Sequence, residues 1–313
     1  MRTSLLFLSL FFALLAARAE APFRIVSYNV ENLFHPDRDS LNPDTLFTPD
    51  GQHRWSFTRY YRKVDNIARV LTNIGEWDGV DIVGLQEVEN ALVVKRLSYT
   101  LRRNEYAYVH YDSPDKRGID VALIYKKSRF DTLSTRAIPV PLGDQTTRDI
   151  LYVCGLKDRT DTLHLLVCHL PSQLGGAAES AWKRQAAKSV LQTTIDSILT
   201  LSPSARIIVM GDMNSAPQAD ISGLTNRMLQ IINPKSEIIN NPGTHKYHGI
   251  WTCLDQFYTS LALDTLSTVR IYNEEWIQEP DEKYLGLKPK RTYNGFRYQN
   301  GFSDHLPIIL ELR

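Results

Sequence analysis

The chain has 313 residues, with 36 Lys and Arg against 35 Asp and Glu, 43% hydrophobic residues and 23% charged residues. These values are typical of a folded soluble protein and exclude a disordered chain, a collagen-like repeat and a multi-span membrane protein. The 3 cysteines are too few for a disulfide-built scaffold, and a chain of this length can bury a large core without cross-links.

The first 19 residues have the layout of a secretory signal peptide. Arg2 gives a positive start, Leu5–Ala16 is a short apolar run, and Ala17-Arg18-Ala19 is a small-x-small cleavage site. The apolar run is shorter than the roughly 20 residues that a membrane span needs. We therefore expect residues 1–19 to be removed and the protein to be exported to the periplasm or the extracellular space, with no membrane span.

The charge balance of the expected mature chain bears on its partners. Removal of Arg2 and Arg18 leaves 34 basic against 35 acidic side chains, a net charge of −1. A protein that binds nucleic acid without sequence preference usually has a basic excess, because its affinity comes from neutralising phosphates. This chain has no such excess, so any contact with a polyanion is expected to depend on a local patch or on metal ions.

Strands and helices alternate after the predicted signal peptide. A run of β-branched and aromatic residues predicts a strand over Phe23–Val30, and apolar residues at helical spacing predict a helix over Arg59–Ile74. A strand over Asp81–Val88 and a helix over Ala91–Arg103 follow. Extended stretches then come at Tyr106–Tyr111, Asp120–Tyr125, Ala137–Val140, Ile150–Leu156 and Leu163–His169. The remaining elements are a long helix over Ala178–Leu199 and strands at Ile207–Met210, Leu254–Ser260, Thr268–Tyr272 and Pro307–Leu312.

This order of elements predicts an α/β protein with mixed sheets, because helices separate strands early and late while hairpin-like strands fill the middle. No linker, repeat or charge block divides the chain, so residues 20–313 are predicted to form one domain. Two long loops, Phe34–Phe57 and Asp281–Gly301, are candidates for a functional role, since loops of that length inside a compact domain often have one.

The cysteines allow two interpretations. Cys154 and Cys168 lie on two neighbouring strand-like runs and could face each other across a hairpin. Buried free thiols are the favoured interpretation, because cysteine is among the most buried residue types. Cys253 has no evident partner.

Polar side chains recur at the ends of the predicted strands. They are Asn29 and Glu31, Glu87, His169, Asp212 and Asn214, Asp255, and Asp304 with His305. Each has an ordinary explanation when taken alone, since Asp-x-Asn is common in turns. Chance placement does not readily account for all of them together, and strand ends are where rigid scaffolds hold functional sites.

The residue types in this set indicate a particular chemistry. Carboxylate and carboxamide oxygens, without paired cysteines or histidines, suit hard cations such as Mg²⁺, Mn²⁺ or Ca²⁺. The two histidines can exchange protons near neutral pH. The chain has no Gly-x-Ser-x-Gly elbow for acyl transfer and no Gly-rich phosphate loop. Hydrolysis of a phosphate ester is the reaction that this combination predicts.

The segments SYNVEN, LQEVEN, RGIDVALIY, HLPS, GDMNSAP, LDQFY and SDHLP occur in this order. Together they resemble the endonuclease/exonuclease/phosphatase superfamily, from about Arg24 to the C-terminus. The resemblance implies a four-layer α/β/β/α sandwich, in which two mixed β-sheets pack face to face and the site lies at one edge of the pair.

The resemblance also implies metal ligands. Glu87 corresponds to the principal metal-binding glutamate, and Asn29 to the asparagine at the end of the first strand that helps to hold metal or phosphate. Asp304 corresponds to a further ligand. Glu31 stands where some members have Asp and is a weaker candidate, the alternative being a solvated loop acid. Mg²⁺, or Mn²⁺ or Ca²⁺, is the expected ion.

The catalytic residues are implied in the same way. Asp212 and Asn214 correspond to the pair that orients or deprotonates the attacking water and binds the phosphoryl oxygen. His305 corresponds to the catalytic histidine, with Asp255 as the acid that orients it. His169 corresponds to the second histidine of the superfamily. By analogy, Asp212 positions water for in-line attack, and His305 stabilises the transition state or protonates the leaving oxygen.

Asp120 and three candidate substrate contacts align less closely with the superfamily. Asp120 falls where an acid partner for His169 would lie. Arg117 is a candidate phosphate ligand, the alternative being a surface turn. Tyr293 and Arg297 belong to a segment of interleaved aromatic and basic residues that would suit a nucleobase, or that would pack as a loop on the core.

His245 and His248 precede Asp255 in the sequence and match no residue of the superfamily that has an assigned role. They are interpreted as surface or loop residues.

The leading hypothesis is an exported, divalent-metal-dependent phosphodiester hydrolase that uses metal-assisted in-line attack by water, with a nuclease as the favoured activity and nucleic acid or another phosphodiester as the substrate. The alternative is a phosphatase or phosphodiesterase for a lipid headgroup or a small phosphorylated metabolite. A third hypothesis is a catalytically silent binding protein, although every matched position carries a competent residue type. The sequence indicates no obligate protein partner.

Overall fold

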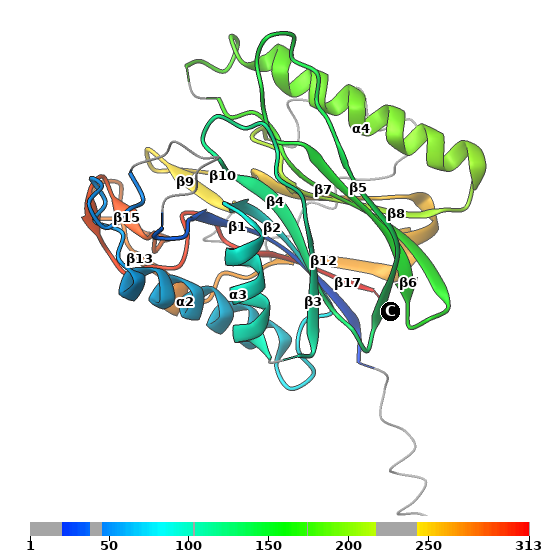
Figure 1. Cartoon of the computed structure of the whole chain (residues 1–313), viewed down its shortest axis with the longest axis horizontal. Coiled ribbons are helices and arrows are strands. Elements are labelled where there is room, and N and C mark those ends of the chain that lie inside the picture. The colour runs from blue at the N-terminus through cyan, green and yellow to red at the C-terminus, as the bar shows by residue number, and fades with distance from the viewer. Residues whose placement is uncertain (1–20, 38–45, 103, 174, 217–242, 313) are drawn as a thin grey trace, which may run out of the picture.

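The computed structural model describes residues 21–37, 46–102, 104–173, 175–216 and 243–312 (Figure 1). The predicted signal peptide, residues 1–19, lies outside the described residues.

The first of two large β-sheets has six strands in the order β12-β17-β1-β2-β4-β3. β1 and β2 are parallel, and the other neighbours are antiparallel, so the sheet is mixed. Its strands are β1 (Phe23–Leu33), β2 (Ile82–Val88), β3 (Tyr106–His110), β4 (Asp120–Lys126), β12 (Ser267–Ile271) and β17 (Ile308–Leu312).

The second sheet has five strands in the order β11-β8-β7-β6-β5. β7 and β8 are parallel, and the remaining pairs are antiparallel. Its strands are β5 (Phe130–Ile138), β6 (Ile150–Lys157), β7 (Asp161–His169), β8 (Arg206–Asp212) and β11 (Asp255–Thr259).

Helices cover the outer faces of the two sheets. In Figure 1, α4 (Ala181–Leu201) lies over the second sheet, and α2 (Phe57–Gly75) and α3 (Ala91–Leu101) lie over the first. The predicted four-layer α/β/β/α sandwich is therefore confirmed. Within the described residues, no helix is both long enough and apolar enough to cross a membrane.

Alternation of side chains along the strands separates the hydrophobic core between the sheets from the cores under the helices. In β1, Phe23 and Ile25 point into the space between the sheets, where they join Met210 of β8. Val26 and Tyr28 point to the opposite face of the strand and belong to the core under α2 and α3. The strands therefore read as continuous apolar runs, because both of their faces are buried.

Gly84 of β2 lies at a point where side chains of the second sheet closely approach the backbone of the first. A Cβ atom at this position would be 2.7 Å from Sδ of Met210 and 3.3 Å from Cγ1 of Val167. Both of these partners belong to the second sheet and are buried. The absence of a side chain at Gly84 thus sets the spacing of the sheets at this point.

We expect Gly84→Ala to lower the free energy of unfolding by about 1–3 kcal/mol, because the added methyl group overpacks a filled core. Urea unfolding of the variant and the wild type measures this cost. In a Met210→Ala background the same substitution should cost clearly less, since the two sites share one space. Equal costs in the two backgrounds would contradict this explanation.

The predicted elements are present, with two kinds of difference at their edges. β5 begins at Phe130, earlier than the predicted Ala137, because most of its side chains are exposed on this edge strand and show no apolar period. The region 243–301 also holds small hairpins that were not predicted, one of them inside the predicted loop Asp281–Gly301. They are β9 (His245–Tyr247) with β10 (Ile250–Thr252), β13 (Gln278–Pro280) with β14 (Leu287–Pro289), and β15 (Tyr293–Asn294) with β16 (Arg297–Tyr298).

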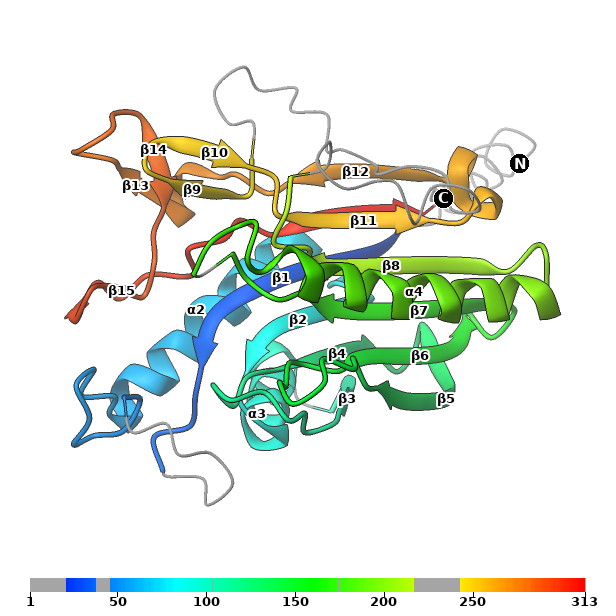
Figure 2. The ribbon, with the colours of Figure 1, turned by 90° about the horizontal axis from the view of Figure 1, so that it is seen from above.

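These hairpins gather at one end of the sandwich (Figure 2). The site described below lies at the same end, because β9 forms an isolated bridge between His245 and His305. The short pairs are two or three residues long, too short for a hydrophobic period to appear in the sequence.

All three cysteines are free and buried. In the register of β6 and β7, Cys154 lies opposite His164, while Cys168 lies opposite Gly211 of β8. The interpretation as buried thiols is confirmed.

Candidate active site

Three neighbouring strands of the second sheet bring Asp212, His169 and Asp255 to one edge. The register places His169 of β7 beside Asp212 of β8, and Asp255 of β11 beside Asp212 from the other side. Neighbouring strands lie about 4.8 Å apart, so these residues must cluster once the register is set. The sequence predicted the three strand ends, and the register explains why they meet.

The carboxylate of Asp212 is the centre of this cluster. Its Oδ2 atom accepts a hydrogen bond from Nδ2 of Asn29 (3.1 Å). The same oxygen lies 3.5 Å from Nε2 of His169 and 3.8 Å from Nε2 of His305. Asp212 is 2% exposed, and burial raises its pKa to about 6, against an opposing effect of His305. A carboxylate with this pKa can accept a proton near neutral pH.

His305 is held in place by Asp255 at its ring and by Ser303 at its backbone. Its Nδ1 atom lies 2.7 Å from Oδ2 of the buried Asp255. Its backbone N–H donates to Oγ of Ser303, and that hydroxyl donates to the carbonyl of Asn29. Burial disfavours the charged imidazole, but the charge and hydrogen bond of Asp255 raise the pKa of His305 well above its usual value. The predicted orientation of His305 by Asp255 is therefore present in the structure.

His169 has the opposite environment. Burial lowers its pKa well below the usual value, and the guanidinium groups of Arg148 and Arg117 lower it further. Among the described residues, its buried Nδ1 atom has no hydrogen-bond partner. The site thus holds one histidine that favours the charged form and one that favours the neutral form.

The predicted pairing of Asp120 with His169 is wrong. Oδ2 of Asp120 lies 3.0 Å from Nε2 of His110, and Oδ1 accepts hydrogen bonds from the backbone and hydroxyl of Ser113. The end of β3 places His110 beside the start of β4, a contact between strands that a sequence pattern does not specify. The carboxylate of Asp120 is therefore bound to His110 and Ser113, and not to His169.

Asn214 organises the loop that follows β8. Its backbone N–H donates to Oδ1 of Asp212 (2.8 Å), and its Nδ2 atom donates to the carbonyl of Leu170 (2.8 Å). Asn214 has a left-handed backbone with φ of 49°, which costs energy in most residues other than glycine and is common at functional sites. Asn214 lies beside Asp212 as predicted, with its amide tied to the His169–Leu170 loop.

Glu87 enters the site through a β-bulge. Gln86 of β2 pairs with Val121 and Val88 pairs with Asp120, so Glu87 is the extra residue and has φ of 64°. A bulge of this kind redirects a side chain. Because the register of β1 and β2 pairs Asn29 with Gln86, Glu87 follows directly after the partner of Asn29.

Arg117 lies at the Glu87 side of the site. Its Nη2 atom donates to Oδ1 of Asn32 (2.7 Å) and is 3.6 Å from Oε2 of Glu87, which accepts the N–H of Asn32. The side chain is 50% exposed, so part of the guanidinium faces solvent. This position fits the predicted role of Arg117 as a phosphate ligand.

The structure gives Glu31 a supporting role in place of the predicted metal ligand. One carboxylate oxygen of Glu31 accepts the N–H of Thr292 (2.6 Å), and the other accepts from Nε of Arg291 (3.3 Å). Nζ of the fully buried Lys63 lies 3.8 Å away and donates to Thr292 and to the carbonyl of Phe302. Glu31 and Lys63 thus anchor the segment that leads to Asp304.

Asp304 remains available at the site edge. Its Oδ2 atom accepts from Nη2 of Arg291 (2.8 Å), and its side chain is 22% exposed. The charges of Asp304, Glu31 and Glu87 raise the pKa of Arg291 although burial opposes this. Arg291 is thus in contact with both Glu31 and Asp304.

The donors that could hold a divalent ion are Glu87, Asn29 and Asp304. All three offer oxygen atoms, which fits Mg²⁺, Mn²⁺ or Ca²⁺ and not a soft metal. The orientation of the Asn29 amide is set, since its Nδ2 donates to Asp212 and its Oδ1 accepts the N–H of Glu31. In the described part of the chain, the one group of three His, Cys or acidic side chains with ligand atoms within 4.8 Å is His110, Asp112 and Asp120.

Tyr293 does not form the predicted stacking surface. It is 6% exposed, packs against Trp55 and Phe47, and donates from its hydroxyl to the carbonyl of His53. The alternative of a loop packed on the core applies to this residue. Arg297 is exposed on the β15–β16 hairpin.

His245 is a site residue that the sequence analysis missed. Its ring lies 4.8 Å from the ring of His305, measured between centroids, and its strand β9 is bridged to the residue at 305. Burial and the nearby His305 lower the pKa of His245 to about 4. The only signal in the sequence was its position shortly before the Asp255 segment.

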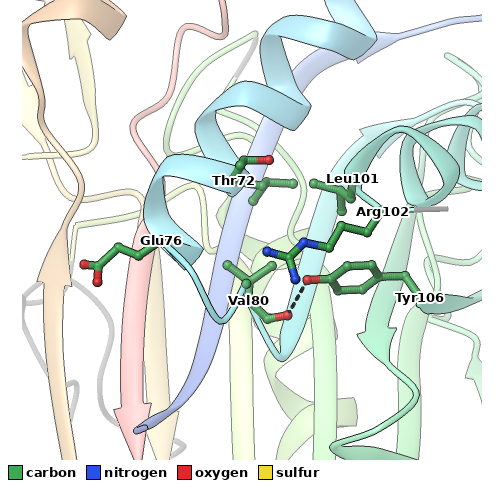
Figure 3. A pocket seen from close by; sticks show the side chains of 8 residues that line it. Thr72, Glu76, Val80, Leu101, Arg102 and Tyr106 are labelled. Carbon is green, nitrogen blue, oxygen red and sulfur yellow. Dashed lines mark hydrogen bonds between the residues drawn. The ribbon is translucent and has the colours of Figure 1, made fainter. Parts of the chain in front are cut away.

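A separate pocket of about 10 Å³ lies between α2, α3 and β3 (Figure 3). Its lining includes Val80, whose carbonyl accepts from the hydroxyl of Tyr106 (2.9 Å). Val80 precedes β2, and Glu87 lies near the other end of that strand. The pocket is large enough for about one water molecule and belongs to the opposite end of the sheet.

Comparisons with known proteins identify the family of the chain. A model of the endonuclease/exonuclease/phosphatase family matches residues 24–313. A comparison with curated proteins gave no match.

Solved structures share the fold. TDP2 from Caenorhabditis elegans, in truncated form, has a TM-score of 0.60 at 18% identity, over 94% of this chain and 98% of that one. TDP2 from D. rerio, complexed with a single-strand DNA product, has a TM-score of 0.56 at 18% identity, over 94% and 100% of the two chains. The human Nocturnin catalytic domain, with a bound sulfate anion, has a TM-score of 0.56 at 17% identity, over 94% and 95%.

The chain belongs to the endonuclease/exonuclease/phosphatase family. It is a metal-dependent phosphoric ester hydrolase of that family.

Proposed function

We propose that this protein is an exported phosphodiesterase that acts as a nuclease. The observation that carries the proposal is the arrangement around Oδ2 of Asp212, with Nε2 of His169 at 3.5 Å and Nε2 of His305 at 3.8 Å. A base flanked by a neutral and a charged imidazole suits attack of water on a phosphodiester with protonation of the leaving oxygen. The D. rerio neighbour, which was solved with a single-strand DNA product, supports nucleic acid as the substrate.

In the proposed reaction, Asp212 orients a water molecule and accepts its proton as the new P–O bond forms. His305, kept charged by Asp255, donates a proton to the leaving oxygen or stabilises the charge that develops on the phosphoryl group. His169, in its neutral form, donates a hydrogen bond to a phosphoryl oxygen. Arg117 binds the phosphate at the Glu87 side.

Glu87, Asn29 and Asp304 would hold the divalent cation. When bound, the cation neutralises the anionic oxygens that repel the attacking water. The Mg²⁺, Mn²⁺ or Ca²⁺ preference follows from the oxygen donors.

The second candidate is a phosphatase or phosphodiesterase for a lipid headgroup or a small phosphorylated metabolite. Burial of Tyr293 favours this candidate, because it removes the predicted aromatic contact for a base. The catalytically silent binding protein is disfavoured, since Asp212, His305 and Asp255 form a connected set of competent groups.

A substrate panel tests the proposal. Protein lacking residues 1–19 would be assayed with each of the three cations on plasmid DNA, single-stranded DNA, RNA, bis-p-nitrophenyl phosphate, p-nitrophenyl phosphate and sphingomyelin. We expect cleavage of nucleic acid and of the diester, loss of that activity with chelator, and recovery with added cation. Turnover of the monoester or the lipid alone would support the second candidate, and inactivity on every substrate would support the binding protein.

Glu87→Gln should raise the cation concentration needed for half-maximal activity by at least about 10-fold, because the ion loses a charged ligand. A titration of activity against Mg²⁺ or Mn²⁺ measures this change. Glu105→Gln, at an exposed acid near the other end of the sheet, is the matched control and should leave the titration unchanged. An unaltered cation requirement in Glu87→Gln would contradict the assignment of this ligand.

A further inference from the structure

An acid fixes the His305 ring at Nδ1, and among the described residues none does so at Nδ1 of His169. Asp255 binds Nδ1 of His305, whereas Nδ1 of His169 is buried without a hydrogen-bond partner among the described residues. The acid predicted for this purpose, Asp120, binds His110 and Ser113. The position of His169 must therefore be set by another part of the molecule.

The backbone of His169 is held by the guanidinium group of Arg148. Nε and Nη2 of Arg148 donate to the carbonyl of His169 (3.2 and 3.0 Å), and Nη2 also donates to the carbonyl of Leu170 (2.8 Å). The side chain of Arg148 is 7% exposed. A planar guanidinium that binds two consecutive carbonyls restrains the end of β7 in both position and direction.

Arg148 also connects this strand end to the other sheet. Its Nη1 atom donates to Oδ2 of Asp115 (3.0 Å), whose side chain is likewise 7% exposed. Asp115 lies in the segment between β3 and β4, while Arg148 precedes β6. The two residues thus form a buried ion pair between the sheets, at the edge that carries the site.

Asp115 also stabilises the backbone turn that contains Arg117. Its Oδ1 atom accepts the N–H of Arg117 (2.9 Å), and its carbonyl accepts the N–H of Gly118 (3.0 Å). Gly118 has φ of 65°, a conformation that glycine adopts without strain. From this turn Arg117 reaches Asn32 and Glu87.

We propose that Arg148 and Asp115 are positioning residues, which hold His169 and Arg117 at a set separation on the two sides of the phosphate. The contacts run without interruption from Glu87 through Arg117, Asp115 and Arg148 to His169, and from there to Asp212. The inference rests on the proposed function for the identity of the group between them. If either His169 or Arg117 shifted by a fraction of an ångström, its hydrogen-bond donor would no longer be aligned with the phosphoryl oxygens.

The test uses the substrate that the wild type turns over in the panel. Arg148→Met should lower kcat by about 10–100-fold with a smaller change in KM, because the groups still bind phosphate but in a poorer geometry. Arg148→Lys keeps the charge without the fork and should recover only part of the loss. Because Arg148→Met leaves Asp115 buried without its cation, the double variant Arg148→Met/Asp115→Asn removes both charges and should show the same loss of kcat.

Two controls separate positioning from a general loss of stability. Arg24→Met removes a similar arginine, which binds Glu311 (2.8 Å) and the carbonyl of Ile74 (2.7 Å) at the opposite end of β1, and should leave kcat unchanged. In a His169→Ala background, Arg148→Met should have little further effect on kcat. Likewise, Asp115→Ala should cause little further loss of kcat in an Arg117→Ala background. Additive losses in both cycles, or an equal loss in Arg24→Met, would overturn the proposal.

A second measurement does not depend on turnover. The ¹⁵N and ¹³C resonances of the His169 imidazole should move in Arg148→Met and stay in place in Arg24→Met. If the wild type is inactive on every substrate while these resonances move, the proposed function fails and the positioning of His169 stands. His169 resonances identical to those of the wild type in Arg148→Met would overturn the positioning role itself.

Discussion

His305→Ala is expected to lower kcat on phosphodiesters by about 10²–10⁴-fold, the usual contribution of a positioned acid or base. Its Nδ1 is held by Asp255 at 2.7 Å and its Nε2 faces Asp212, so the substitution removes a charged donor that is fixed in position. His245, the ring beside it, has a pKa of about 4 and is neutral near pH 7. Steady-state kinetics with bis-p-nitrophenyl phosphate would measure the loss.

The matched control is His164→Ala. His164 lies on β7 of the second sheet and binds the hydroxyl of Tyr152, away from the catalytic cluster. Its substitution should leave kcat within about 2-fold of the wild type, as for surface changes outside the site. Near-normal turnover in a folded His305→Ala protein would refute the assignment of this histidine.

Asp212→Asn is expected to lower kcat by at least about 10²-fold, because the amide cannot accept a proton from the attacking water. The same change should make the cation-free protein more stable at pH 7. Burial raises the folded-state pKa of Asp212 from 3.8 to about 6, so the native state binds this proton more tightly than the unfolded state does. The stabilising effect of that proton is full below about pH 3.8 and is lost as the pH rises through about 6.

At pH 7 the buried carboxylate therefore costs the fold up to about 3 kcal/mol, which the neutral amide avoids. Urea unfolding with chelator present, at pH 7 and pH 5, would measure the difference between Asp212→Asn and the wild type. We expect the gain in the variant to be larger at pH 7 than at pH 5. A variant that is less stable than the wild type at both values, or one that retains turnover, would contradict this account of Asp212.

Local sequence patterns predicted the main elements and the polar residues at the strand ends, while the proposed catalytic roles came from the family resemblance. Both faces of β1, β2, β7 and β8 are buried, so their apolar runs mark them clearly. The spacing of apolar residues marks α2 equally well, since Val64, Ile67, Leu71 and Ile74 are all buried. Asp212, His169, Asp255 and His305 follow or precede such runs, and their positions in the chain could therefore be predicted.

Partners between distant segments could not be predicted in this way. Asp120 binds His110 in place of His169, Tyr293 packs in the core, and Glu31 anchors a segment 261 residues further along the chain. Each of these outcomes depends on strand register or on how a loop folds back over the core. A polar residue in the sequence carries no record of which of its possible partners will lie within hydrogen-bond distance.

The sequence by itself determined the α/β class, the polar strand ends and the oxygen-rich character of the candidate metal ligands, because these depend on local periodicity and residue type. The tertiary structure decided the environments of the two histidines and the role of Arg148. Burial and neighbouring charge move the pKa of His169 down and that of His305 up, although both are buried histidines in contact with Asp212. The difference arises from Asp255 on one side and Arg148 on the other, which only the packing of the two sheets brings into place.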